Sequence, residues 1–228
     1  MIIDRSQWVL IGVLLLGAVG LAQADTFTGV LPTTPGGTNY QAYYDSTTNL
    51  TWLANANASG YVEWSAANTW ADNLSITGYN SAGQQVTVTG WGLPTAGTNC
   101  NQGYNCTGSP MQELYYNGLG GSPASCPVRY CSATFNSSNV NLFSNFSGDA
   151  FYWLATVYAP DPSQQAWFFN FRQGNQGNKY KTDLNNAWAV HSGNVGAAPS
   201  VPEPGALALM LAGLALVGFA ARRRLALR

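Results

Sequence analysis

Four cysteines have the most definite chemistry in this sequence: Cys100, Cys106, Cys126 and Cys131. The apolar amino-terminal segment Trp8–Gly20 predicts export to an oxidising compartment, where an even cysteine count predicts two disulfides. Three pairings are open, and we favour Cys100–Cys106 with Cys126–Cys131 because each bond closes a short loop. A zinc site is the alternative, but separations of five and four residues are poor for zinc ligands.

Catalytic side chains are few. The single histidine, His191, ends a predicted strand, and no Gly-x-Ser-x-Gly motif surrounds a serine. Asp149, Asp161 and Asp183 could form a glycosidase pair only if folding placed two carboxylates about 5–10 Å apart. Asp149 and Asp161 could instead bind calcium with Asn side chains, although no Asp-x-Asp-x-Asp-Gly pattern supports it. We therefore expect no enzyme activity, no cofactor and no metal.

Aromatic rings beside amides indicate sugar binding as a further chemistry. A ring stacks on the apolar face of a pyranose while amides hydrogen-bond its hydroxyls. Five tryptophans fall at apolar-periodic positions or in predicted strands, so we expect most of them in the core: Trp64, Trp70, Trp153, Trp167 and Trp188. The predicted glycan-binding residues lie in two polar loops: Tyr158, Asp161, Gln164, Gln165, Asn175 and Asn178.

The composition narrows the function classes. The chain has 228 residues, a formal net charge of −1 and only 8% charged residues, so it lacks the basic surface that nucleic acids require. One histidine excludes a multi-histidine metal site. Aromatic residues make up 13% and include eight Trp, which favours a folded domain over a disordered chain.

Two helices are predicted, at Glu63–Leu74 and Pro110–Asn117. The first has an apolar face, with Glu63 in its first turn. The second has Ser109 as its N-cap, Gln112 as the partner in a capping box and Gly118 after its end.

The remaining pattern predicts short strands and turns. The expected strands are Tyr40–Asp45, Leu50–Trp52, a run around Val86 and Val88, Phe151–Tyr158, Ala166–Phe171, Lys179–Thr182 and Ala187–His191. Hairpins after two helices favour an α+β domain with an antiparallel sheet.

The amino terminus has the pattern of a secretory signal peptide over residues 1–24. Arg5 precedes the apolar run Trp8–Gly20. Ala22 and Ala24 are the small residues at the −3 and −1 positions of a predicted cleavage site before Asp25. An uncleaved anchor helix is the alternative, although the run is short for a bilayer of about 30 Å.

The carboxyl terminus has three features in order. Val201-Pro202-Glu203-Pro204-Gly205 is followed by the apolar run Ala206–Ala221 and by Arg222-Arg223-Arg224. This tail resembles the PEP-CTERM sorting signal. The resemblance implies membrane insertion, cleavage by an exosortase-type peptidase and a Gram-negative source that exports polysaccharide. A plain membrane anchor is the alternative.

The intervening domain, 25–195, resembles the C-terminal domain of Lcl-type bacterial collagen-like adhesins. The resemblance rests on the order of short motifs: Tyr44-Asp45, Leu50-Thr51-Trp52, Trp64–Leu74, Gly92-Leu93-Pro94-Thr95, Glu113-Leu114, Tyr152-Trp153, Ala166-Trp167-Phe168-Phe169 and Ala187-Trp188-Ala189-Val190. The Leu-Pro-Thr element is similar to formylglycine-generating enzymes, which implies a C-type-lectin-like fold. Gly92 and His191 stand at positions where Lcl-type domains usually have arginine.

These features predict four segments: a signal peptide at 1–24, a domain at 25–195, a linker at 196–205 and a membrane-spanning tail at 206–228. The predicted protein is an exported, non-enzymatic surface or matrix protein in contact with extracellular polysaccharide, with weak glycan binding or adhesion. Two alternatives are a secreted glycan hydrolase and a structural matrix component without a specific ligand.

Overall fold

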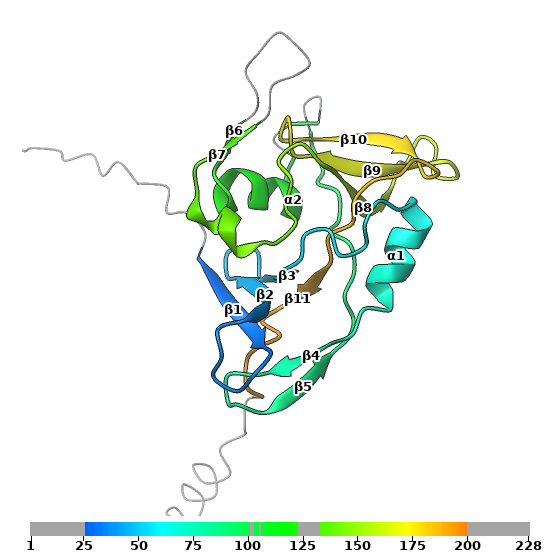
Figure 1. The fold of residues 1–228 in the computed structure, drawn as a ribbon. Coiled ribbons are helices and arrows are strands. Elements are labelled where there is room, and N and C mark those ends of the chain that lie inside the picture. Colours follow the sequence, from blue (N-terminus) through cyan, green and yellow to red (C-terminus); the bar gives the residue numbers. More distant parts are fainter. Residues whose placement is uncertain (1–25, 101–102, 105, 123–132, 200–228) are drawn as a thin grey trace, which may run out of the picture.

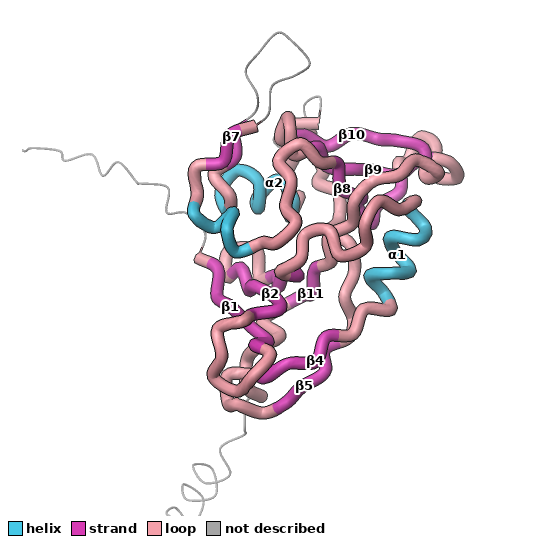
Figure 2. Tube along the Cα trace, viewed as in Figure 1, coloured by secondary structure: helices cyan, strands magenta, loops and turns pink. Residues whose placement is uncertain are grey.

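The computed structural model describes residues 26–100, 103–104, 106–122 and 133–199. Strands are the main regular elements of these ranges (Figure 1), and turns and loops make up much of the rest (Figure 2). The described strands are β1 Phe27–Pro32, β2 Tyr40–Asp45, β3 Leu50–Leu53, β4 Ile76–Tyr79, β5 Gln85–Val88, β6 Gly121–Ser122, β7 Thr134–Phe135, β8 Phe151–Val157, β9 Gln165–Asn170, β10 Asn175–Tyr180 and β11 Val190–Ser192. The described helical segments are α1 Trp64–Asp72, α2 Pro110–Glu113, the π-helical η1 Leu114–Gly118 and the 3-10 helix η2 Ser138–Leu142.

In the described part of the chain, the strands form four small antiparallel sheets. The largest has the order β1-β2-β3-β11, so the final strand pairs with the third. β8, β9 and β10 form a second sheet in chain order, and α1 lies beside it in Figure 1. The Trp64 indole Nε1 joins the helix to this sheet by donating to the Leu154 carbonyl at 2.8 Å.

The α+β, C-type-lectin-like class expected from the sequence is wrong. Strands both precede and follow the helices, and α1 and α2 contain only nine and four residues. Helices this short cover little sheet surface, so the described structure is mostly β. Nothing in the described ranges identifies a C-type-lectin-like fold, and the signal and tail helices expected to flank the domain lie outside those ranges.

The β2–β3 hairpin has a turn that local chemistry explains. The Asp45 carboxylate accepts from the Thr47 amide at 2.8 Å and from the Thr48 hydroxyl at 2.6 Å. Asn49 closes the turn with a φ of 54°, in the left-handed region that Asn tolerates. The strands agree with the expected Tyr40–Asp45 and extend Leu50–Trp52 by one residue.

The two helices form where expected, with differences at their ends. Glu63 is the extended residue before α1 and not a member of its first turn. At α2, the Ser109 hydroxyl accepts from the Gln112 amide at 3.3 Å, as predicted for the N-cap. The Gln112 carboxamide oxygen accepts from the Cys106 amide at 2.6 Å, so Gln112 links the helix to the preceding loop.

Two strand assignments in the carboxyl-terminal half are wrong. β10 begins at Asn175 and ends at Tyr180, whereas Lys179–Thr182 was expected. β11 contains only Val190–Ser192, and the preceding Ala187–Ala189 is buried without forming a strand. The β10 sequence is rich in Asn and Gly, which have low strand propensity, so its pairing with β9 decides its conformation.

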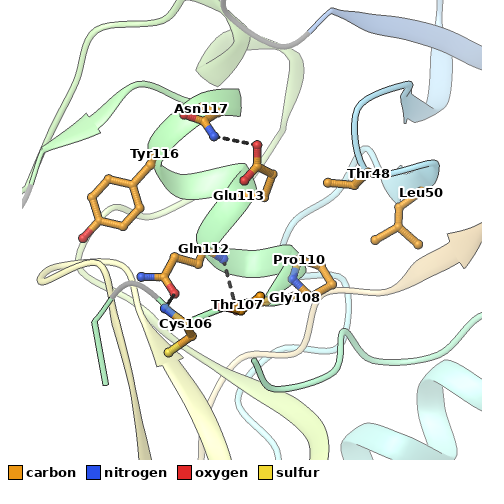
Figure 3. Close-up of a pocket in the computed structure, with 11 residues that line it drawn as sticks. Thr48, Leu50, Cys106, Thr107, Gly108, Pro110, Gln112, Glu113, Tyr116 and Asn117 are labelled. Atoms are coloured by element: carbon orange, nitrogen blue, oxygen red, sulfur yellow. Dashed lines mark hydrogen bonds between the residues drawn. The ribbon is translucent and has the colours of Figure 1, made fainter. Parts of the chain in front are cut away.

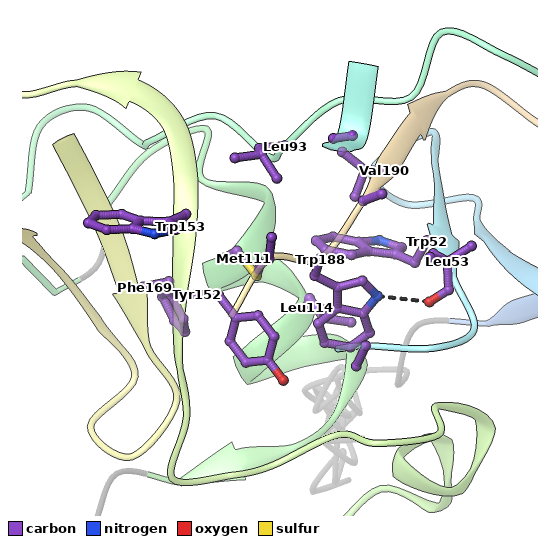
Figure 4. Close-up of a cluster of buried hydrophobic side chains, with 14 of the residues drawn as sticks. Trp52, Leu53, Leu93, Met111, Leu114, Tyr152, Trp153, Phe169, Trp188 and Val190 are labelled. Carbon is purple, nitrogen blue, oxygen red and sulfur yellow. Dashed lines mark hydrogen bonds between the residues drawn. The ribbon is translucent and has the colours of Figure 1, made fainter. Parts of the chain in front are cut away.

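The core lies between the two larger sheets and α2 (Figure 4). Trp153 and Trp188 are fully buried, as predicted, and Trp52 joins them. The other predicted core tryptophans, Trp64, Trp70 and Trp167, are half-buried and pack against this cluster.

Candidate functional site

Aromatic and amide side chains gather on one face of the β8–β9–β10 sheet. The rings of Tyr158 and Trp167 meet edge to face, with centroids 5.2 Å apart. Trp167 is the register partner of Asn178, and Gln165 is the partner of Tyr180. Because alternate strand residues share a face, these four strand residues lie on the same side. We call Tyr158, Gln165, Trp167, Asn178 and Tyr180 the aromatic–amide face.

Hydrogen bonds fix the polar side chains at the edge of this face. The Asn178 amide donates to the Gln165 side-chain oxygen. The Gln165 amide nitrogen in turn donates to the Asp161 carboxylate at 3.2 Å. Asp161 also accepts from the Ser163 hydroxyl and the Gln164 amide, at 3.1 and 3.3 Å. The β8–β9 connection is therefore an ordered turn, and the Gln164 side chain is exposed on it.

The structure brings together most of the predicted glycan-binding residues. Tyr158, Asp161, Gln164, Gln165 and Asn178 lie on the aromatic–amide face or at its edge.

Asn175 does not belong to this group. It is three strand positions from Asn178, and residues three apart in a strand point to opposite faces. Its Oδ1 atom is buried without a hydrogen-bond partner.

Sequence reasoning missed two members of the face. Trp167 is one of the predicted core tryptophans, and the structure places it half-buried at the margin of the core. Tyr180, whose side chain is 55% exposed, was not considered as a binding residue. Its two-residue spacing from Asn178 could have indicated the shared face once β10 was known to extend that far.

The carboxylates considered for catalysis lie at both ends of this sheet. Asp149 precedes β8 and its Oδ1 lies 4.0 Å from the Arg172 Nε. Asp161 follows β8, which contains seven residues and is therefore about 20 Å long. A glycosidase pair needs a separation of about 5–10 Å, so Asp149 and Asp161 do not form one. Asp183 lies in the turn after β10, where its amide donates to the Tyr180 carbonyl at 2.9 Å.

His191 and Gly92 occupy the edge of the four-stranded sheet. His191 is the register partner of Thr51, and its ring lies 5.7 Å from that of Trp91. Gly92 exchanges two 2.9 Å backbone hydrogen bonds with Val190. His191 therefore belongs to the pairing of β11 with β3, and Gly92 pairs with the first residue of β11. Within the described residues, no group of three His, Cys, Asp or Glu side chains is arranged to hold a metal ion.

A separate pocket of about 650 Å³ lies along α2 and η1 (Figure 3). Its volume falls in the range of small-molecule sites. Thr48 and Leu50 approach the helix from one side, while Gln112 and Tyr116 extend on the other. Glu113 lines the pocket and its carboxylate accepts from Asn117 at 2.5 Å. None of the glycan-binding residues predicted from the sequence lines this pocket.

A disulfide joins Cys100 and Cys106. The buried Gln176 of β10 contacts the loop that this disulfide closes, because its backbone amide donates to the Gly103 carbonyl at 2.9 Å. The Gln176 side chain donates to the Gly97 carbonyl at 2.9 Å and accepts from the Gly97 amide at 3.0 Å. The disulfide loop is thereby connected to the sheet that bears the aromatic–amide face. Cys126 and Cys131 lie outside the described residues, so their pairing stays a prediction.

Replacing both Cys100 and Cys106 with serine is expected to lower the free energy of unfolding by roughly 2 kcal/mol, because the unfolded chain regains the entropy of a short loop. Urea denaturation of the processed protein, with and without reductant, measures this change. Reductant should lower the free energy of unfolding of the parent more than that of the variant, and the difference should equal the stability lost in the variant. Alkylation of the folded parent without reductant should label neither Cys100 nor Cys106, and rapid labelling of either would contradict the prediction.

The described chain ends in a segment that is hydrogen-bonded to the domain. The Thr51 hydroxyl donates to the Gly193 carbonyl at 2.6 Å. The Ser81 amide donates to the Gly196 carbonyl at 2.8 Å, and the Ala198 amide donates to the Ser81 hydroxyl at 3.0 Å. Contacts with the domain therefore continue to Ala198, two residues beyond the expected start of the linker at 196.

Beyond this segment, residues 200–224 match the family model of the PEP-CTERM protein-sorting motif. The tail is a sorting signal. Its Val201–Pro204 and Arg222–Arg224 elements lie outside the described residues. The PEP-CTERM motif implies an exported protein whose membrane-anchored precursor is processed by exosortase, itself a membrane protein.

The domain between the termini has no such match. No curated protein and no solved structure matches the chain. The resemblance to Lcl-type adhesins therefore has no support beyond the motif order itself. Several of those motifs contain fully buried residues, such as Trp52, Trp153 and Trp188. Buried aromatic residues are common in protein cores, so they do not distinguish one family from another. The signal-peptide residues Ala22, Ala24 and Asp25 lie outside the described residues. Among the residues that are described, no helix is both long and apolar enough to span a bilayer.

Proposed function

We propose that this PEP-CTERM protein is a non-enzymatic surface or matrix protein that binds extracellular polysaccharide weakly through its aromatic–amide face. Its final location would be the cell surface or the extracellular matrix of a Gram-negative bacterium. The sorting motif supports export and processing. The observation that supports glycan binding is the Tyr158–Trp167 ring pair beside the Gln165–Asn178 amides.

The chemistry of this face suits a saccharide. Partly exposed aromatic rings present an apolar surface for the C–H face of a pyranose, and Tyr180 adds an exposed ring at the edge. Side-chain amides provide donors and acceptors for hydroxyl groups. The residues come from paired strands, so the site needs little ordering when it binds, and this lowers the entropic cost.

The charges favour a neutral glycan over an anionic one. The described cations are already engaged with other groups of the domain. Lys179 lies over the Phe151 ring at 4.5 Å, Lys181 lies over the Trp64 ring at 4.4 Å, and Arg172 faces Asp149. Acidic residues outnumber basic residues by eight to four between positions 25 and 200. A polyuronate would therefore meet net repulsion at low salt.

Replacing Asn178 or Tyr180 with alanine is expected to weaken binding of neutral oligosaccharides by about tenfold, the effect of losing about 1.4 kcal/mol of interaction. Both side chains are exposed, so the free energy of unfolding should change by less than about 0.5 kcal/mol. A neutral-glycan array identifies the ligand, and calorimetric titration with the processed protein measures the affinity.

Tyr61→Ala is the matched control, because Tyr61 is also an exposed tyrosine, at 66%, and lies before α1. It should bind like the parent. If Asn178→Ala and Tyr180→Ala also bind normally while Glu113→Gln loses affinity, the pocket along α2 is the binding site. If the parent binds no glycan, the protein is a structural matrix component. Cleavage of the oligosaccharide would show instead that it is a hydrolase.

A further inference from the structure

The sorting tail is joined to the domain by a short connection. Ala198 is the last residue with a described hydrogen bond to the domain, and the apolar run begins at Ala206. Eight Cα–Cα steps span at most about 29 Å when fully extended. A domain of this size has a radius of gyration of about 16 Å, and therefore a diameter of about 40 Å. This connection, from Ala198 to Ala206, is shorter than the diameter of the domain. The end of the domain from which the chain leaves therefore stays near the membrane.

That end of the domain consists of three segments around a cavity of about 420 Å³. They are the turn 33–39 after β1, the segment 80–85 that follows β4 and ends at the first residue of β5, and the exit segment 194–198. Figure 1 shows the chain leaving the domain beside the β4–β5 hairpin. We call these three segments the exit face.

The exit face contains no charged residue. Its segments read Thr-Thr-Pro-Gly-Gly-Thr-Asn, Asn-Ser-Ala-Gly-Gln-Gln and Asn-Val-Gly-Ala-Ala. Most of these residues are exposed, in a domain that has few charged residues overall. The acidic residues within the described ranges lie elsewhere, in β2, before and in α1, in α2, and around the β8–β10 sheet.

We propose that the exit face lies against the lipid headgroups in the membrane-anchored precursor. A bilayer that contains anionic lipid repels nearby carboxylates, and this repulsion is strong only within about 10 Å of the surface at 0.1 M salt. A neutral, polar face on the membrane side lets an otherwise acidic domain sit close to that surface. The aromatic–amide face belongs to the other large sheet and stays available for ligands.

Amide hydrogen exchange of the full-length precursor tests this orientation. The precursor is placed in nanodiscs of phosphatidylethanolamine and phosphatidylglycerol, without exosortase. The reference is the processed protein mixed with the same nanodiscs. Amides in 33–39 and 80–85 should exchange several-fold more slowly in the precursor, while those of α1 exchange equally in both. Equal exchange everywhere, or slowing over the whole surface, would overturn the proposal.

Two variants separate lipid contact from other causes of protection. Thr34→Glu with Gln85→Glu should abolish the slowing in anionic nanodiscs and retain it in phosphatidylcholine nanodiscs. Ala66→Glu, which adds a carboxylate on the exposed side of α1, should have no effect. A Gly-Ser insertion between Ser200 and Val201 should reduce protection, because a longer tether lowers the effective concentration of the face at the surface. Protection that appears only after exosortase is added would mean that the face binds the peptidase, which also overturns the proposal.

Discussion

Replacing Trp188 with alanine is expected to lower the free energy of unfolding by about 4–5 kcal/mol. Its side chain is fully buried, and its ring packs against aromatic residues from several elements. Ring centroids lie 5.3 Å away for Trp52, 4.9 Å for Phe143 and 5.6 Å for Tyr152. The indole Nε1 also donates to the Leu53 carbonyl at 2.8 Å. Because a domain has only about 5–15 kcal/mol of stability, this loss should lower the melting temperature and the yield of folded protein.

Urea denaturation followed by far-ultraviolet circular dichroism measures the change without depending on tryptophan fluorescence. Trp188→Phe retains part of the ring packing and should cost less than Trp188→Ala. Tyr61→Ala removes an exposed ring and should change stability by less than about 0.5 kcal/mol. A loss below about 1 kcal/mol in Trp188→Ala would show that this ring is not a core residue.

The processed protein is expected to lack its carboxyl-terminal tail. The PEP-CTERM match covers residues 200–224, and Pro202-Glu203-Pro204 precedes the apolar run within it. Intact-mass analysis of the released protein should therefore give a carboxyl terminus close to Pro202–Gly205. Replacing Pro202, Glu203 and Pro204 with alanine should leave nearly all of the protein as the membrane-anchored precursor.

Pro162→Ala is the control for this experiment, because it removes an exposed proline from the β8–β9 turn and leaves the tail intact. It should be processed like the parent. A mature surface protein that ends at Arg228 would contradict the prediction and identify the tail as a permanent anchor.

Features that depend on residues close together in the sequence could be predicted from the sequence alone. Asp45 and Asn49 stabilise their own turn, so the β2–β3 hairpin could be predicted from adjacent residues. Ser109 caps α2 through a contact three residues away. The sorting tail is recognised by its linear order of motif, apolar run and arginines, which requires no folding at all.

The fold class depended on pairings that adjacent residues do not specify. β11 pairs with β3 across about 140 residues, and this pairing places His191 opposite Thr51. The first helix is also shorter than the predicted Glu63–Leu74, because α1 begins at Trp64 and ends at Asp72. Such long-range contacts decide the architecture, and no local pattern records which strands are partners.

The candidate site shows the same division. The sequence identified Tyr158, Gln165 and Asn178 by their chemistry. It could not show that the side chains of Asn178 and Asn175 point to opposite faces of a strand, because this requires β10 to begin at Asn175. Once these residues are in a strand, the two-residue period sends them to opposite faces, and only Asn178 joins Trp167. The tertiary pairing of β9 with β10 therefore selected the members of the site from candidates that the sequence could only list.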